Sequence, residues 1–173
     1  MASGIDLPKV EAGTQNAKVP RRQRRRMTRD GVVVVDNEET RDDAFEVRRA
    51  VFVEEQGVPE SLEWDEYEDE ATHVVAYDEG QPVGAARFRD YDLDGDRVCK
   101  VERVAVLESA RGEDWGRRLM EVVEGEAEAA GFDRFFLHAQ TSAREFYQKL
   151  GYEQVGEEFL EADIPHVKMV KSL

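Results

Sequence analysis

Hydrophobic and polar residues follow two different periods along this chain, and the periods predict where strands and helices lie. Short runs rich in valine, alanine and phenylalanine, bounded by glycine or polar turns, are typical of β-strands. Such runs cover residues 31–35, 72–77, 82–88, 98–106, 134–140, 152–161 and 166–172. Apolar residues spaced three and four apart are typical of helices. This spacing covers residues 39–57, 115–130 and 142–151, and a short, very acidic helix or loop is expected at 59–71.

The ends and the apolar faces of the three predicted helices support these assignments. Thr40 is a candidate N-cap of the first helix, because its hydroxyl can accept a hydrogen bond from an unpaired backbone N–H. Glycines follow the second and third helices, where a helix commonly ends. The residues expected to face the core are Ala44, Val47, Val51, Leu119, Met120, Val123, Ala127, Ala130, Ala143, Phe146, Tyr147 and Leu150.

The order of these elements predicts one layered domain of the α/β (α+β) class, with a mixed central sheet of about six to seven strands and helices on both faces. The polar segment between residues 77 and 82 predicts a hairpin. The strand–helix–strand unit of residues 98–138 is expected to form a right-handed crossover, which places its two strands parallel. Alternation along the first of these strands places Glu102, Val104 and Val106 on one face, and Arg103 and Ala105 on the other.

Charge divides the 173-residue chain in two. The net charge is −15, yet residues 1–30 carry +5, from eight basic and three acidic residues, which leaves −20 for residues 31–173. We interpret 1–30 as a basic, disordered arm and 31–173 as the folded domain. Three interpretations of the arm compete: a nucleic-acid-binding tail, a solvated extension, or a misassigned start with Met27 as the true first residue. Its composition favours the last two. Lysine is scarce beside arginine, so the acidic surface suggests a halophilic source, with an ordinary acidic surface as the alternative.

Several classes of protein are not expected. No apolar run approaches the roughly 18 residues that suggest a membrane span, and no signal peptide is evident. The single Cys99 excludes an intramolecular disulfide, which fits a cytoplasmic protein. The three histidines lie far apart in sequence, at 73, 138 and 166, so we expect no metal site. An acidic chain repels nucleic acid, which is therefore not expected as a partner.

The turn between the strand at 98–106 and the helix at 115–130 has the character of an anion site. The first turn of a helix has unpaired N–H groups, and a glycine-containing turn lets the backbone approach a ligand. Arg111 adds a planar pair of donors suited to phosphate oxygens. Many such turns hold only water, which is the alternative at this point.

The chain resembles the GNAT family of acetyl-CoA-dependent N-acetyltransferases over residues 31–173, and the ElaA-like branch in particular. The resemblance is carried by "VFVEEQGVPESLEWDEYEDEATH", "ERVAV", "LHAQ", "EFYQKLGY" and "EADIPH". It implies that the turn holds the pyrophosphate of coenzyme A and that the preceding strand pairs with the pantetheine arm. The implied cofactor-binding residues are Val104, Ala105, Val106, Arg111, Gly112, Glu113, Asp114, Trp115, Gly116 and Arg117.

One position departs from the family pattern, in which the first glycine of the turn stands where this chain has Asp114. Aspartate tolerates the left-handed backbone conformation better than most residues, so the turn can still form. Its carboxylate would repel the pyrophosphate, and at molar salt a Debye length of about 3 Å would screen that repulsion. The alternative is that Asp114 caps the helix and points away from the ligand.

Amine acetylation needs a base for the amine and an acid for the departing thiolate. The resemblance implies that Tyr147 donates the proton, with a core aromatic as the alternative. Glu102 is a candidate base, with a solvent-facing or salt-bridged glutamate as the alternative. His138 is a third candidate for proton exchange, as are His73 and His166, although a structural role is the alternative for each. Cys99 is interpreted as a small buried residue, because direct transfer needs no nucleophile.

The sequence therefore predicts transfer of an acetyl group from acetyl-CoA to a primary amine by direct attack, without a metal. The acceptor is a small-molecule or peptide amine, and a homodimer is left open. The alternative is a non-catalytic acyl-CoA-binding module, tethered to nucleic acid by the arginine-rich arm. The acidic stretch from Glu60 to Glu70 either attracts a cationic amine or is surface solvation, and surface solvation is favoured.

Overall fold

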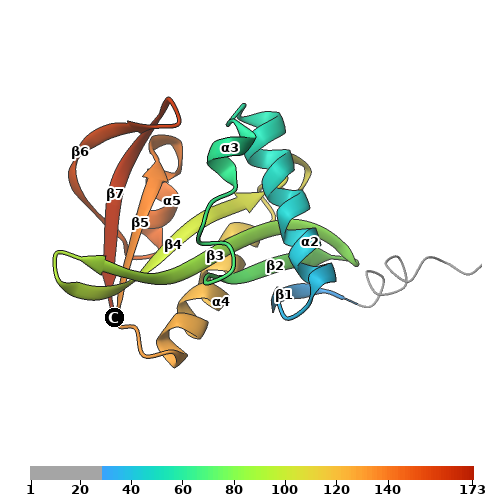
Figure 1. The fold of residues 1–173 in the computed structure, drawn as a ribbon, viewed down its shortest axis with the longest axis horizontal. Coiled ribbons are helices and arrows are strands. Elements are labelled where there is room, and N and C mark those ends of the chain that lie inside the picture. Colours follow the sequence, from blue (N-terminus) through green and yellow to red (C-terminus); the bar gives the residue numbers. More distant parts are fainter. Residues whose placement is uncertain (1–28) are drawn as a thin grey trace, which may run out of the picture.

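The computed structural model describes residues 29–173, which form a mixed seven-stranded sheet with helices on both faces (Figure 1). The strand order is β1-β2-β3-β4-β5-β7-β6, and neighbouring strands are antiparallel except for the parallel pair β4 and β5. The predicted architecture is confirmed. The strands are β1 Gly31–Val34, β2 Thr72–Asp78, β3 Gln81–Leu93, β4 Asp96–Val106, β5 Arg134–Gln140, β6 Glu153–Glu161 and β7 Ile164–Ser172.

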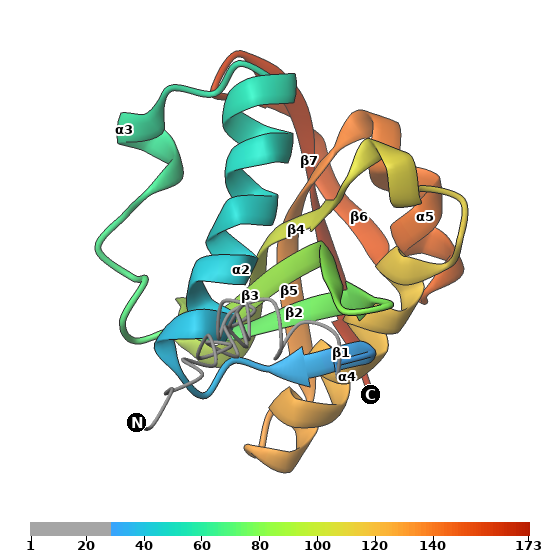
Figure 2. The same cartoon turned by 90° about the vertical axis from the view of Figure 1, so that its right-hand side faces the viewer.

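The helices lie in two layers, one on each side of the sheet (Figure 2). One apolar cluster joins β2 and β3 to the first helix, and the other joins the sheet to the helix after β4 and to the last helix. None of the helices among the described residues is long and apolar enough to cross a membrane. The helices are α2 Glu38–Arg48, the π-helix η1 Arg49–Glu55, α3 Glu60–Glu63, the 3-10 turn η2 Glu108–Ala110, α4 Trp115–Ala129, the 3-10 turn η3 Thr141–Ala143 and α5 Arg144–Lys149.

Two residues of the predicted arm, just before β1, make contacts with the folded domain. Residues 1–28 of the predicted arm lie outside the described residues. Arg29 and Asp30, however, contact the fold. The Arg29 guanidinium donates to the Tyr77 hydroxyl at 3.3 Å and lies 3.6 Å from the Glu39 carboxylate, and an Asp30 carboxylate oxygen accepts from the Glu79 backbone N–H at 3.4 Å. These two residues therefore belong to the folded domain.

The first helix differs from its prediction at both ends. Asn37, not Thr40, is the N-cap of α2, and its side chain accepts from the Thr40 backbone N–H at 3.0 Å. Thr40 takes the third position and completes a capping box. The helix then widens into η1, a geometry that hydrophobic periodicity does not report. Of the expected core residues, Ala130 is exposed, because α4 ends at Ala129.

The predicted alternation along β4 is wrong because the strand contains a bulge. Arg103 has a left-handed backbone with φ 57, and the register with β3 shifts at this point. Beyond the bulge, Val104 and Val106 pack against the cluster beneath α4, together with Val101. Glu102 lies opposite Arg87 on the other face of the sheet.

The two parallel strands at the centre of the sheet separate after a short contact. Pairing between β4 and β5 covers three residue pairs, from Cys99↔Phe135 to Val101↔Leu137, whereas β4 continues to Val106 and β5 to Gln140. The strands therefore form a fork that opens toward their carboxyl ends. At such a point no neighbouring strand covers the facing backbone edges, which favours ligand binding.

Candidate active site

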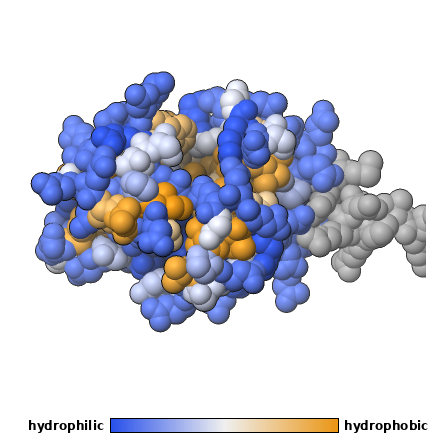
Figure 3. Space-filling view, turned by 90° about the horizontal axis from the view of Figure 1, so that it is seen from above, coloured by the Kyte–Doolittle hydropathy of each residue, from blue (hydrophilic) through white to orange (hydrophobic). Residues whose placement is uncertain are grey.

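A cleft of about 370 Å³ lies in the fork between β4 and β5. Its walls come from η1 and α3 on one side and from the β6–β7 hairpin on the other. Seen from above, the molecule shows apolar patches separated by charged side chains (Figure 3). Of the predicted site residues, Glu102, Val104, His138 and Tyr147 line this cleft, together with His166. The predicted phosphate turn does not line it, so the two parts of the predicted site are distinct regions.

Tyr147 combines the two roles that the sequence left open. Its side chain is buried and belongs to the core cluster, packed against the rings of Phe146 and Tyr152. It also lines the cleft, and its hydroxyl has no hydrogen-bonding partner among residues 29–173. Burial raises the pKa of Tyr147 above its ordinary value. The phenol is therefore protonated at neutral pH and able to donate.

Glu102 lies in a dense ion network. Its carboxylate is 2.7 Å from the Arg87 guanidinium, 3.1 Å from Arg89 and 3.2 Å from the Lys100 ammonium. Burial opposes ionisation, but the hydrogen bond from Arg89 and the charges of Arg87 and Lys100 outweigh it and lower the pKa of Glu102 to about 2. A carboxylate with so low a proton affinity is a poor general base at neutral pH.

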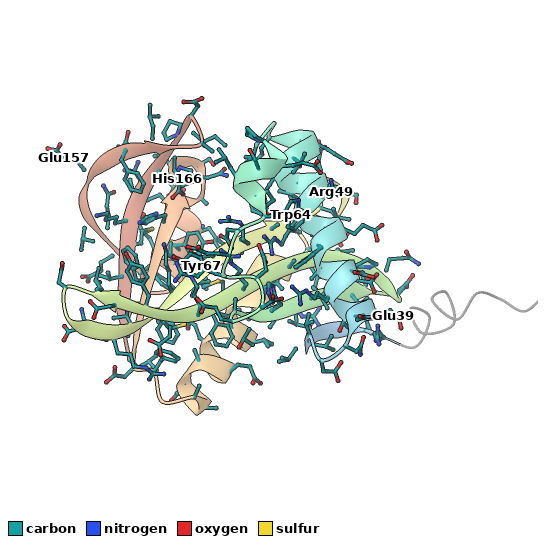
Figure 4. The ribbon with its side chains drawn as sticks, in the orientation of Figure 1. Glu39, Arg49, Trp64, Tyr67, Glu157 and His166 are labelled. Carbon is teal, nitrogen blue, oxygen red and sulfur yellow. The ribbon has the colours of Figure 1, made fainter. Side chains whose placement is uncertain are left out.

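The acidic stretch from Glu60 to Glu70 is not simply surface solvation, which corrects the favoured interpretation. Glu63 is buried, and its carboxylate accepts from Arg48 at 2.8 Å. Glu68 binds both Arg48 and Arg87, at 2.7 and 2.8 Å. The inward-facing acids thus bind this segment to the sheet. Tyr67 and Trp64 add ring contacts, with Tyr67 stacking on the Arg89 guanidinium at 3.7 Å from the ring centroid (Figure 4).

Arg103 secures the same segment from the bulge in β4. Its guanidinium lies 3.1 Å from the Glu63 carboxylate and 3.2 Å from Asp65, and it donates to the backbone carbonyls of Leu62 and Glu63 at 3.3 and 3.2 Å. These contacts compensate for the left-handed backbone of Arg103, which costs free energy in a residue with a side chain. These contacts therefore attach α3, which forms one wall of the cleft, to β4 at the point where β4 separates from β5.

His138 and His166, far apart in sequence, meet across the other wall of the cleft. The Nδ1 atom of His138 lies 3.1 Å from a carboxylate oxygen of Glu161, and the Nε2 atom of His166 lies 3.5 Å from the other oxygen. All three residues line the cleft. The hydrogen bond from His138 and the charges of both histidines lower the pKa of Glu161, against the effect of burial. His73 is buried elsewhere, beside the Glu68 carbonyl at 2.7 Å.

The predicted phosphate turn has an open backbone, but its arginine is engaged. Arg111 donates to both carboxylate oxygens of Glu55 at 2.7 Å and to the Val106 carbonyl at 3.1 Å. Gly112 has φ 82, and a Cβ atom there would meet nothing within 4 Å. No side chain caps the start of α4, whose first backbone hydrogen bond runs from the Arg118 N–H to the Asp114 carbonyl at 3.1 Å. Glu113 is exposed beside this opening.

Asp114 adopts the left-handed conformation, with φ 71, as the turn requires. Its carboxylate does not cap the helix and instead accepts from Arg117 Nε at 2.8 Å, and this hydrogen bond lowers the pKa of Asp114. Trp115 is buried in the core, so that only its backbone is available to a ligand. A Cβ atom on Gly116 would lie 3.1 Å from the Phe146 ring, so this glycine allows α4 and α5 to approach closely.

The edge of β4 facing the fork carries the other predicted cofactor-binding positions. On its far side, this part of β4 pairs with β3, with Ala105 opposite Ala85 and Val106 opposite Gly84. The Val106 carbonyl accepts from Arg111, whereas Val104 lines the cleft. Cys99 is fully buried, as expected, and burial raises the pKa of its thiol to about 12. Nothing in this geometry suits a nucleophilic cysteine.

Three features of the site were missed by sequence reasoning. Glu161, which joins two histidines, was one of 39 acidic residues and carried no signal beyond its place before "ADIPH". Glu55, which binds Arg111, lies 56 positions earlier in the chain. The Gln140 side chain also donates to the Gln56 side chain at 2.7 Å, linking the end of β5 to η1 across the cleft. No local pattern reports such long-range pairs.

Comparisons with known proteins agree with this architecture. A family model described as "Acetyltransferase (GNAT) domain" matches residues 25–173. An uncharacterized N-acetyltransferase of Bacillus subtilis, YjcF, is 47% identical over 140 residues, covering 80% of this chain and 97% of that protein. The protein ElaA of Escherichia coli is 32% identical over 131 residues, covering 75% of this chain and 85% of ElaA.

Solved structures give the same result for the fold. The crystal structure of Escherichia coli ElaA superimposes with a TM-score of 0.68 and 26% identity, covering 82% of this chain and 98% of that one. An acyl-CoA N-acyltransferase from Pseudomonas aeruginosa superimposes with a TM-score of 0.66 and 27% identity, covering 82% and 99%. The family model, the relatives and the seven-stranded sheet agree, and the chain belongs to the GNAT family of acetyltransferases.

Proposed function

We propose that this protein transfers an acetyl group from acetyl-CoA to a primary amine by direct attack. The observation that carries the proposal is the cleft at the fork of β4 and β5, which buried Tyr147 lines together with His138 and His166, beside an open strand edge. Family membership supports acyl transfer in general. The proposal goes beyond family membership in naming acetyl-CoA as the donor and a primary amine as the acceptor.

The residues that would hold the donor fit an extended anionic molecule. The open backbone around Gly112 and the uncapped start of α4 suit a pyrophosphate. Arg111 and Arg117 lie at the same turn, paired with Glu55 and with Asp114 and Glu121, and would hold the phosphates by exchanging these partners. The edge of β4 from Val104 to Val106 would pair with the pantetheine arm and lead from this turn into the cleft. When bound, acetyl-CoA supplies a thioester whose carbonyl carbon is the electrophile.

Proton transfers are the main chemical task of the protein. An ammonium R–NH₃⁺ loses one proton before its nitrogen lone pair attacks, and a second as the C–N bond forms and the C–S bond breaks. We assign Tyr147 as the donor that protonates the departing thiolate sulfur. Its phenolate then takes up the second amine proton, which restores the phenol and balances the reaction. The first proton passes to a base and then to solvent.

Glu102 fits a positioning role better than the role of base. Its pKa of about 2 leaves it ionised but weakly basic at neutral pH. Its contacts with Arg87, Arg89 and Lys100 connect β4 to β3 directly beneath the fork. We propose that it keeps the opening of β4 in place, while the base lies on the opposite wall of the cleft.

The proposal is tested by mixing the protein with acetyl-CoA and a panel of primary amines, and measuring free thiol and acetylated product by mass. We expect turnover with at least one amine. Tight binding of acetyl-CoA without turnover of any amine would identify a non-catalytic acyl-CoA-binding module. Failure to bind acetyl-CoA would refute the assignment of the donor site as well.

A further inference from the structure

Glu161 joins two histidines in the wall of the cleft formed by β5, β6 and β7. Its two carboxylate oxygens face His138 Nδ1 at 3.1 Å and His166 Nε2 at 3.5 Å. Glu161 has no lysine or arginine within salt-bridge distance in residues 29–173, whereas Glu63 and Glu102 in the same cleft are bound by arginines. Its contact partners are therefore the two imidazoles, with the charge of Lys100 acting on it from a greater distance.

The hydrogen bonds decide which nitrogen of each ring is free. A carboxylate only accepts, so neutral His138 carries its proton on Nδ1 and leaves a lone pair on Nε2. Among residues 29–173, no hydrogen-bonding partner faces this Nε2 atom. A carbonyl also only accepts, so His166 donates from Nδ1 to the Ile164 carbonyl at 2.6 Å. Its Nε2 atom faces the Glu161 carboxylate, which is favourable only when that nitrogen carries a proton, so neither nitrogen of His166 is free for a substrate.

Packing holds the ring of His138 in place. His138 is held edge-to-face between the rings of Phe136 and Phe159, with centroids at 5.2 and 4.9 Å. Its side chain is 21% exposed, compared with 9% for His166. His138 thus has a fixed, partly exposed ring, with Nε2 free of protein partners among residues 29–173, on the cleft that Tyr147 also lines. Other charged residues on or beside this cleft are Glu63, Lys100, Glu102, Arg103 and, opposite His138 in the register of β7, Lys168.

We infer that His138 is the base that takes the first proton from the acceptor ammonium, and that Glu161 is the positioning residue that fixes its tautomer and stabilises its imidazolium. The proton leaves the amine nitrogen for His138 Nε2, and the amine lone pair becomes free to attack the thioester carbon. The two residues act as a carboxylate–histidine pair, in which the carboxylate orients the imidazole and stays ionised throughout. When His166 is protonated, its Nε2 atom forms an ion pair with the second carboxylate oxygen of Glu161. This inference rests on the proposed acyl transfer.

The first test needs no acceptor. The imidazole nitrogens of His138 are followed by NMR against pH in the wild type and in Glu161→Gln, with Glu157→Gln as the control. Glu157 is an exposed residue of the same strand and lies at the outer edge of the sheet, away from His166 (Figure 4). We expect Nδ1–H to predominate in neutral His138 of the wild type. Glu161→Gln should weaken this preference for the Nδ1–H tautomer, because the amide offers a donor as well as an acceptor to Nδ1.

The second test measures kinetics with an amine that is turned over. His138→Gln should lower kcat about 10²–10⁴-fold while the KM for acetyl-CoA changes little. Glu161→Gln should lower kcat about tenfold or more with little change in the KM for acetyl-CoA, whereas Glu157→Gln should leave kcat unchanged. Thermal unfolding confirms that each variant is folded, and Glu161→Ala serves as a second variant.

The outcomes separate this inference from the proposed function. Absence of turnover with every amine by the wild type would refute the proposed function. Turnover that survives in His138→Gln would refute the assignment of His138 while leaving acyl transfer intact. A tautomer preference of His138 and a kcat that are both unchanged in Glu161→Gln would show that Glu161 does not position the imidazole.

Discussion

Replacing Glu102 by glutamine separates a structural carboxylate from a catalytic one. Glutamine keeps the size of the side chain and removes the charge that Arg87, Arg89 and Lys100 share. The side chain of Glu102 is 10% exposed, and that of Arg87 is fully buried. The substitution therefore leaves buried positive charge with less compensation, which is one of the more costly changes in a folded protein.

The magnitude follows from the pKa of Glu102. A carboxyl whose pKa falls from the ordinary 4.5 to about 2 on folding contributes roughly 3 kcal/mol to stability at neutral pH. This contribution is complete above pH 4.5, because the group is ionised in both states there. It is lost as pH falls through the folded-state pKa of about 2. We therefore expect Glu102→Gln to be less stable than the wild type by about 3 kcal/mol at pH 7, and the difference to shrink below pH 4.5.

The assay is urea unfolding at several pH values between 7 and 3, with Glu128→Gln on the exposed face of α4 as the control. Stability equal to that of the control at pH 7 would refute the stabilising role of the network. Activity is measured in parallel, well below the unfolding temperature. A folded Glu102→Gln protein that loses kcat by 100-fold or more, with a pH profile lacking its acidic limb, would restore Glu102 as the base.

Four further predictions concern the donor site, the acid and the boundary of the domain. Tyr147→Phe keeps the ring packing and should lower kcat about 10²–10⁴-fold with little change in acetyl-CoA affinity, measured by steady-state kinetics and calorimetry; an unchanged kcat would leave Tyr147 a core aromatic. Asp114→Gly should tighten acetyl-CoA binding, more at low salt than at high salt, as calorimetric titration at two salt concentrations would show; weaker binding at both would mean that the carboxylate is needed. Glu55→Gln frees Arg111 for the pyrophosphate and should tighten binding by at most about fivefold, because an exposed pair contributes little; weaker binding would show that Glu55 positions the guanidinium. A chain that starts at Met27 retains Arg29 and should melt at the temperature of the full chain by calorimetry, and a large drop would place the removed residues in the fold.

The order of the elements follows from local properties of the sequence. Valine-rich runs between turn residues become β1, β2 and β4 because β-branched side chains suit a pleated, half-buried surface. The apolar stripe of α4 is buried where its 3.6-residue period places it. The glycine-containing turn between β4 and α4, predicted to bind phosphate, is likewise defined by neighbouring residues. Each of these signals lies within a few residues, so neighbouring positions are sufficient to define it.

The chemistry of the cleft depends on contacts that only tertiary structure decides. Arg103 adopts a left-handed backbone that arginine does not favour, and the compensation comes from carbonyls and carboxylates some 40 positions earlier. Glu161 of β6 meets His138 of β5 although β7 lies between these two strands, a contact between residues 23 positions apart. The acidic segment binds inward because buried arginines lie on the strand faces beneath it. Ion pairs of this kind depend on the path of the whole chain, because charge attracts over space rather than along sequence.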